Sequence, residues 1–269
     1  MDPIVWNVDR AIINLGFFEL RYYSVLFAGS IFLGYLLLKR FMVKEGKDPM
    51  LMDSLLTYVV VGTIAGARLA HCLFYEPAVY LNDPIRILKV WEGGLASHGG
   101  YLGVIIGLIL FCWKHHEIAF FWLADRVAIP AMFCGGCIRV GNLFNSEILG
   151  KATDVPWAFV FAKYDQVPRH PTPIYEALGY FTIFLILYGY YRLQNRQVLE
   201  GRLLGMVLIL GYSFRIFVEQ FKMVQETFEM TLPLNMGQLL SVPFILIGIY
   251  FTLGLHHKVP FFQRGLSGK

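Results

Sequence analysis

Charged residues are scarce in this chain of 269 residues, where Asp, Glu, Lys and Arg make up 16%, against about 25% in ordinary soluble domains. Apolar residues make up 57%, and the mean hydropathy is +0.55. This composition excludes disordered and collagen-like chains and argues against a soluble globular enzyme. Because the net charge is only +4, we interpret the basic residues as membrane-topology signals and expect no nucleic-acid partner.

Cysteines and metal-ligand patterns are also sparse. Four cysteines lie within or at the ends of apolar runs: Cys72, Cys112, Cys134 and Cys137. They predict neither a disulfide framework nor a zinc site, and we expect no metal and no cofactor. The CxxC formed by the last two lies in an apolar segment, where small packing residues are the simpler interpretation. The N-terminus begins Met1-Asp2-Pro3 and has no basic n-region and no small-residue cleavage site, so we expect no cleavable signal peptide.

Long apolar runs are what the chain has in abundance. Seven segments cover about 19–38, 51–72, 95–113, 118–138, 173–191, 203–221 and 236–255. Each is close to the ~20 residues that a helix needs to cross the hydrocarbon core. We therefore predict an all-α integral membrane protein of about seven transmembrane helices, forming one polytopic domain over 1–269. The long polar connection at about 139–172 is expected to form a small periplasmic head segment.

The distribution of Lys and Arg predicts how the chain is oriented. One set of loops, which ends with the C-terminus, carries 11 basic residues in short segments. The other set carries 7, several of them in the long 139–172 connection. The positive-inside rule therefore places the N-terminus outside and the C-terminus in the cytoplasm.

Several spans carry polar or ionisable side chains, which are costly in a bilayer and therefore mark candidate functional sites. By the predicted topology they lie at one depth, near the outer ends of six spans: Tyr23, Arg68, His98, Arg139, Asn142, Glu176, Arg215 and Glu219. This convergence predicts a polar cavity that opens to the outer leaflet. Asp125 and Arg126 lie toward the inner half of their span and are assigned a packing role instead.

His98 stands in the densest of these patterns, because five glycines lie around it in residues 91–103. Glycine lets a backbone or a ligand approach closely, and histidine exchanges protons near neutral pH. The structural alternative is Gly-rich helix packing with a hydrogen-bonded histidine. The polar surroundings favour a functional histidine.

Two further patterns suit a phosphate-bearing ligand. Arg139 offers a planar fork of donors that fits phosphate, and Asn142 follows it closely. The alternative is an interfacial arginine and a helix cap. Arg215 and Glu219 are four residues apart on one helix face, so they form a structural ion pair, a phosphate site, or both.

The chain resembles the bacterial phosphatidylglycerol–prolipoprotein diacylglyceryl transferase family in several motifs that follow the family's order. They lie at 22–23, 66–68, 93–100, 139–147 with Gly150 and Thr153, 170–176, 215–219 and 236–238. The part from Arg139 to Glu147, with Gly150 and Thr153, looks like the family signature. The chain departs from the family's usual residues at a few positions outside the candidate site: Ser24, Ser97, Ile138, Gly211 with neighbouring Tyr212, and Lys222.

The resemblance implies a reaction in the bacterial inner membrane. The diacylglyceryl group of phosphatidylglycerol moves to the lipobox cysteine thiol of a preprolipoprotein signal peptide, a thioether forms, and glycerol 1-phosphate leaves. Such a displacement requires loss of the thiol proton, stabilisation of the leaving phosphate, and alignment of carbon and sulfur. The implied chemistry requires no cofactor.

The resemblance also implies roles for individual residues. His98 would be the general base, and Arg139 and Arg215 would hold the phosphodiester. Substrate-binding roles fall to Tyr23, Asn142, Glu147, Gly150, Glu176, Glu219 and Arg68. The open alternative is that His98 only binds phosphate, while Glu147 or a water molecule takes the proton.

Two other classes of membrane protein remain as alternatives. A lipid-binding or small-solute transporter would also have many spans and buried charges, but we find no inverted repeat and the polar groups gather at one leaflet. An intramembrane protease would need a Ser–His pair or two aspartates. Ser97 and His98 are adjacent in the chain, so their side chains diverge along a helix.

Overall fold

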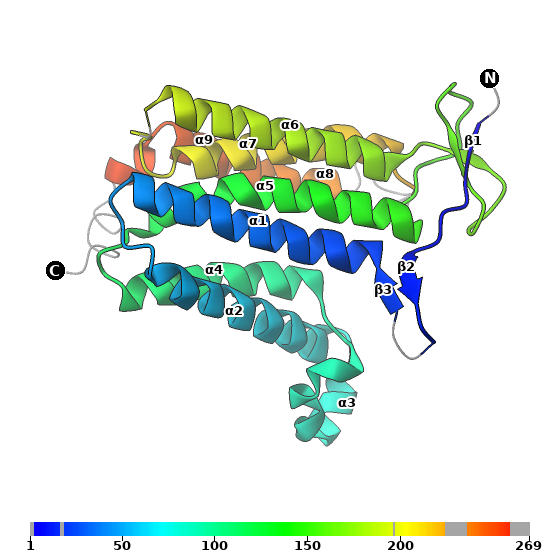
Figure 1. Cartoon of the computed structure of the whole chain (residues 1–269), viewed down its shortest axis with the longest axis horizontal. Helices are drawn as coiled ribbons and strands as arrows, with labels where there is room; N and C mark the ends of the chain where they lie inside the picture. Colours follow the sequence, from blue (N-terminus) through cyan, green and yellow to red (C-terminus); the bar gives the residue numbers. More distant parts are fainter. Residues whose placement is uncertain (1–2, 17–18, 196, 224–235, 259–269) are drawn as a thin grey trace. The chain divides into compact units, whose positions relative to one another are not determined.

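The computed structural model describes residues 3–16, 19–195, 197–223 and 236–258. The chain divides into two compact units, each described by itself below. The first unit comprises Met1–Leu38 and Asp125–His256, and the second comprises Lys39–Ala124 and His257–Lys269. Both are built mainly from helices (Figure 1).

Helices occupy all the apolar segments that the sequence predicts as spans. They are α1 (Tyr22–Lys44), α2 (Leu51–Phe74), α4 (Ser97–Lys114), α5 (Phe120–Asn145), α6 (Thr172–Leu193), α7 (Arg202–Val218), α8 (Met236–Leu239) and α9 (Ser241–Thr252). Within the described ranges, four stretches are long and apolar enough to cross a membrane, namely Tyr22–Lys44, Leu51–Phe74, Phe120–Asn145 and Arg202–Phe221. The last of these includes the 3-10 turn η3 (Glu219–Phe221). The protein is therefore a mostly helical, multi-pass membrane protein.

Helix α5 extends past its predicted end at 138. It continues to Asn145, so Arg139 and Asn142 lie in its last two turns and the polar connection begins at Ser146. The polar residues there do not end the helix because their side chains have polar partners, which are described below.

In the second unit, α2 and α4 lie side by side (Figure 1) and touch through glycines. A Cβ atom at Gly103 would lie 2.7 Å from the carbonyl carbon of Gly62 and 3.2 Å from Cα of Gly66. A Cβ at Gly107 would lie 2.6 Å from the carbonyl oxygen of Tyr58. Small residues four apart thus let the two backbones approach closely, as membrane helices commonly do.

The connection between α2 and α4 contains α3 (Pro77–Asn82) and the 3-10 turns η1 (Pro84–Leu88) and η2 (Val90–Glu92). A further 3-10 turn, η5 (Leu255–Lys258), follows α9.

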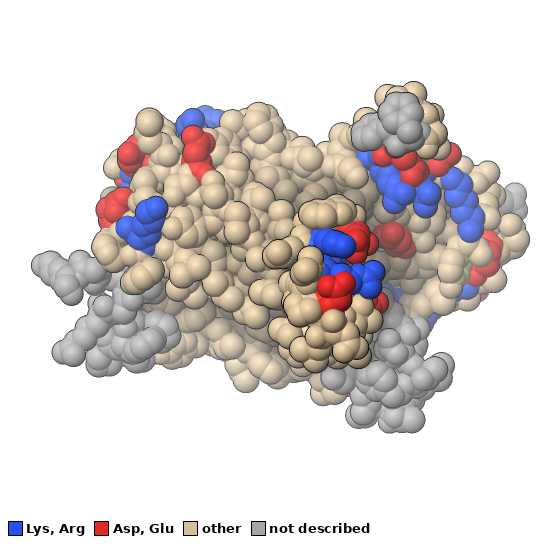
Figure 2. Space-filling model, turned by 90° about the horizontal axis from the view of Figure 1, so that it is seen from below, with Lys and Arg blue, Asp and Glu red and all other residues tan. Residues whose placement is uncertain are grey.

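Figure 2 shows a face of the molecule where charged side chains form separate groups and other residues cover the surface between them. Large apolar side chains are exposed on both α2 and α4, for example Leu69, Leu73, Leu102 and Ile105, and such side chains suit contact with lipid.

In the first unit, α7 and α9 pack through a glycine pair, since a Cβ at Gly248 would lie 2.8 Å from the carbonyl oxygen of Gly205. Asp125 of α5 is fully buried and accepts hydrogen bonds from the amides of Gly201 (2.9 Å) and Leu204 (2.8 Å). It thereby satisfies free amides at the first turn of α7, which is the packing role expected for it.

Short strands form the rest of the first unit. A sheet of order β1-β4-β5 joins Ile4–Trp6 to Phe159–Phe161 in parallel and then to Pro168–Arg169. A hairpin joins β2 (Ala11–Asn14) and β3 (Glu19–Arg21). The all-α prediction missed these strands because runs of two to four residues carry no periodic signal. The sheet packs on a small core of Leu143, Leu149, Phe159 and Phe161.

Candidate functional site

The end of α5 carries the first part of the site. The amide nitrogen Nδ2 of Asn142 donates to one carboxylate oxygen of Glu147 (2.9 Å), and Nδ2 of Asn145 donates to the other (3.2 Å). Nη1 of Arg139 approaches Oδ1 of Asn142 to 3.5 Å. Glu147 therefore contacts Asn142, and Asn142 in turn lies beside Arg139.

The turn after α5 brings Glu147 back toward the helix. Its flanking residues, Ser146 and Ile148, have φ angles of +54° and +56°, a left-handed conformation that costs roughly 1–2 kcal/mol per residue outside glycine. The amide of Glu147 donates to the carbonyl oxygen of Asn142 (3.0 Å). Backbone strain of this kind persists where the surroundings hold it in place, often at functional sites.

Glu176, near the start of α6, is the centre of an ion-pair network. Its side chain is 2% exposed. One carboxylate oxygen lies 3.3 Å from Nε of Arg139, and the other lies 2.9 Å from Nζ of Lys222. Lys222 also lies 3.2 Å from the carboxylate of Glu219. Buried charges are stable only when they are paired. This network therefore connects α5 and α6 to the turn η3 and the residue that follows it.

Arg215 stands apart from this network. Among the residues that the structure describes, it has no hydrogen-bond or ion-pair partner, and Glu219 pairs with Lys222 instead. A Cβ at Gly237 would nevertheless lie 3.4 Å from Nη2 of Arg215 and 3.1 Å from the carboxyl carbon of Glu219. The guanidinium of Arg215 thus borders the network while its donors remain open to an anion.

Tyr23 and Gly150 complete the first-unit residues that the sequence singled out. Tyr23 packs beside the Arg139 turn of α5, because a Cβ at Gly141 would lie 2.7 Å from its ring. The amide of Gly150 donates to the carbonyl oxygen of His170 (3.1 Å), and a Cβ there would lie 2.6 Å from the His170 Cβ. The absence of a side chain at Gly150 thus lets the backbone of His170 pass close to it.

The remaining two predicted residues belong to the second unit. His98 lies in the first turn of α4 and is exposed. Arg68, on α2, is 2% exposed and donates to backbone carbonyls of the segment before α4. The structure thus brings eight predicted residues into the first unit and two into the second. The eight are Tyr23, Arg139, Asn142, Glu147, Gly150, Glu176, Arg215 and Glu219.

Three features near the site were given no role from the sequence. Lys222, which the sequence placed outside the candidate site, is the second cation on Glu176, and its position three residues after Glu219 was the available signal. Asn145 helps to hold Glu147. In the polar connection, Nε1 of Trp157 donates to the hydroxyl of Tyr175 (2.7 Å), which lies 3.1 Å from Nδ1 of His170.

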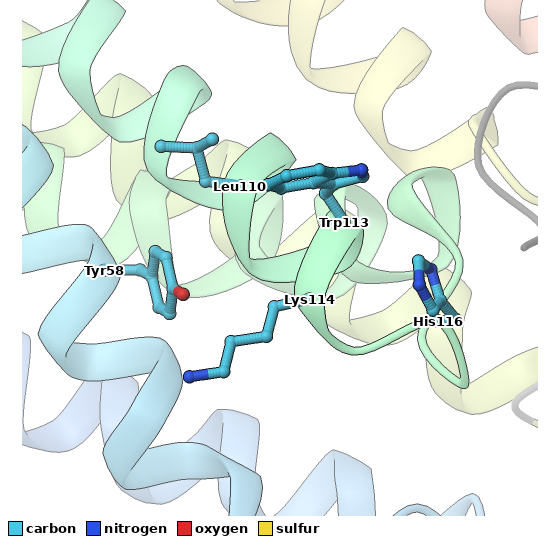
Figure 3. A pocket seen from close by; sticks show the side chains of 5 residues that line it. All are labelled: Tyr58, Leu110, Trp113, Lys114 and His116. Atoms are coloured by element: carbon cyan, nitrogen blue, oxygen red, sulfur yellow. The ribbon is translucent and has the colours of Figure 1, made fainter.

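A cavity of about 490 Å³ lies elsewhere in the second unit (Figure 3). Its lining residues are Tyr58, Leu110, Trp113, Lys114 and His116. At 1.5 Å per helical residue, Lys114 lies ~24 Å along α4 from His98, so this cavity is separate from the histidine. Within the described ranges, no group of three or more His, Cys, Asp or Glu could hold a metal ion.

A model of the family described as prolipoprotein diacylglyceryl transferase matches residues 10–253, which include every site residue named above. The chain belongs to the prolipoprotein diacylglyceryl transferase family. Relatives named phosphatidylglycerol–prolipoprotein diacylglyceryl transferase cover nearly all of it. The protein of Tolumonas auensis is 47% identical over 250 residues, or 93% of this chain and 96% of the relative. That of Chloroherpeton thalassium is 43% identical over 246 residues, with 91% and 92% covered.

Proposed function

We propose that this chain transfers the diacylglyceryl group of phosphatidylglycerol to a cysteine thiol of a prolipoprotein, a step of lipoprotein maturation. The family match over residues 10–253 carries this proposal. The sulfur attacks the glyceryl carbon that bears the phosphate. A C–S bond forms, the C–O bond breaks, the thiol proton passes to a base, and glycerol 1-phosphate leaves.

Arg139 and Arg215 are the groups that we assign to the phosphodiester and the charge that develops on it. Fixed donors stabilise such charge more strongly in a site of low dielectric. The support for Arg215 is that its donors have no partner in the described part of the chain. The network that Arg215 borders is already balanced, with two cations, Arg139 and Lys222, and two carboxylates, Glu176 and Glu219. An anionic head group would therefore find its free donors at Arg215.

His98 is our candidate for the base that takes the thiol proton. The alternative base, Glu147, already accepts hydrogen bonds on both carboxylate oxygens from Asn142 and Asn145. His98 is exposed and has no partner within the described ranges, which favours it for the exchange of a proton with a substrate.

The finer topology belongs to the same proposal. We propose one polytopic domain over 1–269 with seven spans, the N-terminus outside and the C-terminus in the cytoplasm. The site would face the outer leaflet, where the lipobox cysteine of a signal peptide emerges from the membrane. The excess of Lys and Arg in the loops on the side of the C-terminus supports this orientation.

The test is a reaction with purified full-length protein, phosphatidylglycerol and a lipobox peptide. Mass spectrometry would detect a diacylglyceryl adduct on cysteine, and a peptide with Ser in place of that Cys is the control. We expect an adduct that disappears with Arg139→Ala. No adduct from intact peptide, although phosphatidylglycerol binds, would refute transfer and favour a lipid-binding or transport protein.

The base assignment is tested in the same reaction. We expect His98→Ala to abolish turnover while the protein remains folded. Near-normal turnover of His98→Ala, alongside an inactive Arg139→Ala, would refute His98 as the base and direct attention to Glu147.

A further inference from the structure

The side chain of Arg68 donates hydrogen bonds to the backbone of the segment that precedes α4. Its Nε donates to the carbonyl oxygen of Ile87 (3.1 Å). Its Nη1 donates to the carbonyls of Gly93 and Gly94, the latter at 3.3 Å, and Nη2 donates to that of Arg86. All three guanidinium nitrogens thus bind main-chain oxygens, and the side chain is 2% exposed.

The segment is shaped to meet this guanidinium. Gly93 and Gly94 have φ angles of +88° and +71°, which only glycine adopts at little cost. A Cβ at Gly94 would lie 2.9 Å from Nη1 of Arg68 and 2.6 Å from the ring of His71. The ring of Tyr80 covers the guanidinium, with its centroid 5.0 Å from the guanidinium carbon.

The two residues before Arg68 hold the chain next to His98. The amide of Ala96 donates to the carbonyl oxygen of Ala67 (3.0 Å). Gly99 packs on Gly66 so closely that a Cβ at Gly99 would lie 2.9 Å from the Gly66 carbonyl carbon. Three consecutive residues of α2 therefore fix the backbone on both sides of His98.

We propose that Gly66, Ala67 and Arg68 together position His98, and that Arg68 acts on the reaction through this backbone without contacting substrate. This inference rests on the role proposed for His98. It gives Arg68 a positioning role in place of the substrate-binding role that the resemblance implied. A planar fork of five N–H donors suits several carbonyls at once, whereas the compact ammonium of lysine does not.

Arg68→Lys separates the two roles, because it keeps the positive charge and loses the fork. If Arg68 positions His98, kcat falls about 10- to 100-fold, as expected for a misplaced catalytic group, and the KM for phosphatidylglycerol stays nearly constant. If Arg68 instead binds phosphate, the KM for phosphatidylglycerol rises in Arg68→Lys and rises further in Arg68→Ala. That second result would overturn the inference.

Gly94→Ala tests the same contact without replacing an ionisable side chain. The added Cβ meets Nη1 of Arg68 and the ring of His71, so kcat is expected to fall as in Arg68→Lys. Gly46→Ala is the matched control, because Gly46 also has a positive φ (+69°) but has nothing within 4 Å of the added Cβ. Equal activities of the two variants would contradict the inference.

A readout independent of turnover is the rate at which diethyl pyrocarbonate modifies His98, followed by mass spectrometry. His116, which is exposed, serves as the internal reference. We expect Arg68→Lys to change the His98 rate severalfold while the His116 rate stays constant. An unchanged His98 rate would overturn the positioning role. A changed rate, together with full activity of His98→Ala, would uphold the positioning of His98 and refute its role as base.

Discussion

Arg139 and Arg215 carry the same guanidinium group in different surroundings. Arg139 is paired with Glu176, approaches Asn142, and lies 5.8 Å from the ring centroid of Tyr180. Arg215 is exposed and has no partner in the described ranges. The first is therefore held in place by the fold, and the second has its donors open to a ligand.

This difference predicts a split between activity and stability. Arg215→Gln should lower kcat about 100- to 1000-fold, as loss of one fixed donor does. Its free energy of unfolding should change by less than about 0.5 kcal/mol, as for an exposed residue. Arg139→Gln should lower both, because it leaves the buried Glu176 short of a cation. Peptide turnover and thermal unfolding in detergent measure the two quantities, and equal destabilisation by both variants would contradict the account.

Glu176 gives a second prediction at the residue scale. Glu176→Ala removes the carboxylate between Arg139 and Lys222 and should destabilise the protein by about 3–5 kcal/mol, the usual cost of breaking a buried pair. Asp165→Ala breaks the more exposed pair with Arg169 and should cost no more than about 1 kcal/mol. Thermal unfolding of both variants measures the difference, and similar losses would show that the network contributes little.

The sequence alone could not predict which carboxylate pairs with which cation. The residues of the network were visible as polar positions in apolar segments, and the family motifs named most of them. Their pairing depends on how α5, α6 and the end of α7 pack, because Glu176 reaches Lys222 across 46 positions of sequence. The spacing of Arg215 and Glu219 suggested a pair that the structure replaces with Glu219 and Lys222.

Helices were the most predictable elements, because long apolar runs admit few other structures in a membrane. The end of α5 was not predictable in this way. By hydropathy, Arg139 and Asn142 mark the end of a span, but the helix continues because both side chains have polar partners. The short strands β1, β4 and β5 were also missed, because their pairing is set by the core around Leu143 rather than by local pattern.

The close glycine contact between α2 and α4 predicts how a larger residue there affects stability. Gly103→Ala places a Cβ 2.7 Å from the carbonyl carbon of Gly62, so the helices must separate and stability should fall. Gly211→Ala on α7 has nothing within 4 Å and should leave stability unchanged or raise it by up to about 1 kcal/mol through helix propensity. Thermal unfolding compares the two, and a harmless Gly103→Ala would contradict the close packing.

The polar connection before α6 should loosen in mild acid. Burial lowers the pKa of His170 below its ordinary value of 6.5, so the unfolded segment binds a proton more readily and stability falls as the pH drops below that value. The hydrogen bonds from Arg169 lower the pKa of Asp165 below 3.8, so that carboxylate keeps its contribution until the pH is lower still.

Hydrogen exchange of the segment 147–172, corrected for the intrinsic rate, tests this expectation. Protection should decline from about pH 7.5 to about pH 5 in the wild type and stay nearly constant in His170→Gln. His116→Gln is the matched control and should behave as the wild type does. Equal pH dependence in all three proteins would exclude His170 as the cause.

For the whole molecule, the charge distribution predicts one orientation in the membrane. The count of 11 basic residues in one set of loops against 7 in the other predicts a cytoplasmic C-terminus. A reporter that is active only in the cytoplasm, fused after Lys269, should be active. Activity only of a reporter that requires the outside would reverse the topology.

The most direct test of the central claim is where the head-group glycerol goes during turnover. Phosphatidylglycerol with deuterium only in its head-group glycerol would be incubated with the full-length protein and a lipobox peptide. Mass spectrometry should find an unlabelled diacylglyceryl group on the cysteine and all the deuterium in released glycerol phosphate. Deuterium on the peptide, or an unmodified peptide beside consumed lipid, would contradict transfer of the diacylglyceryl group.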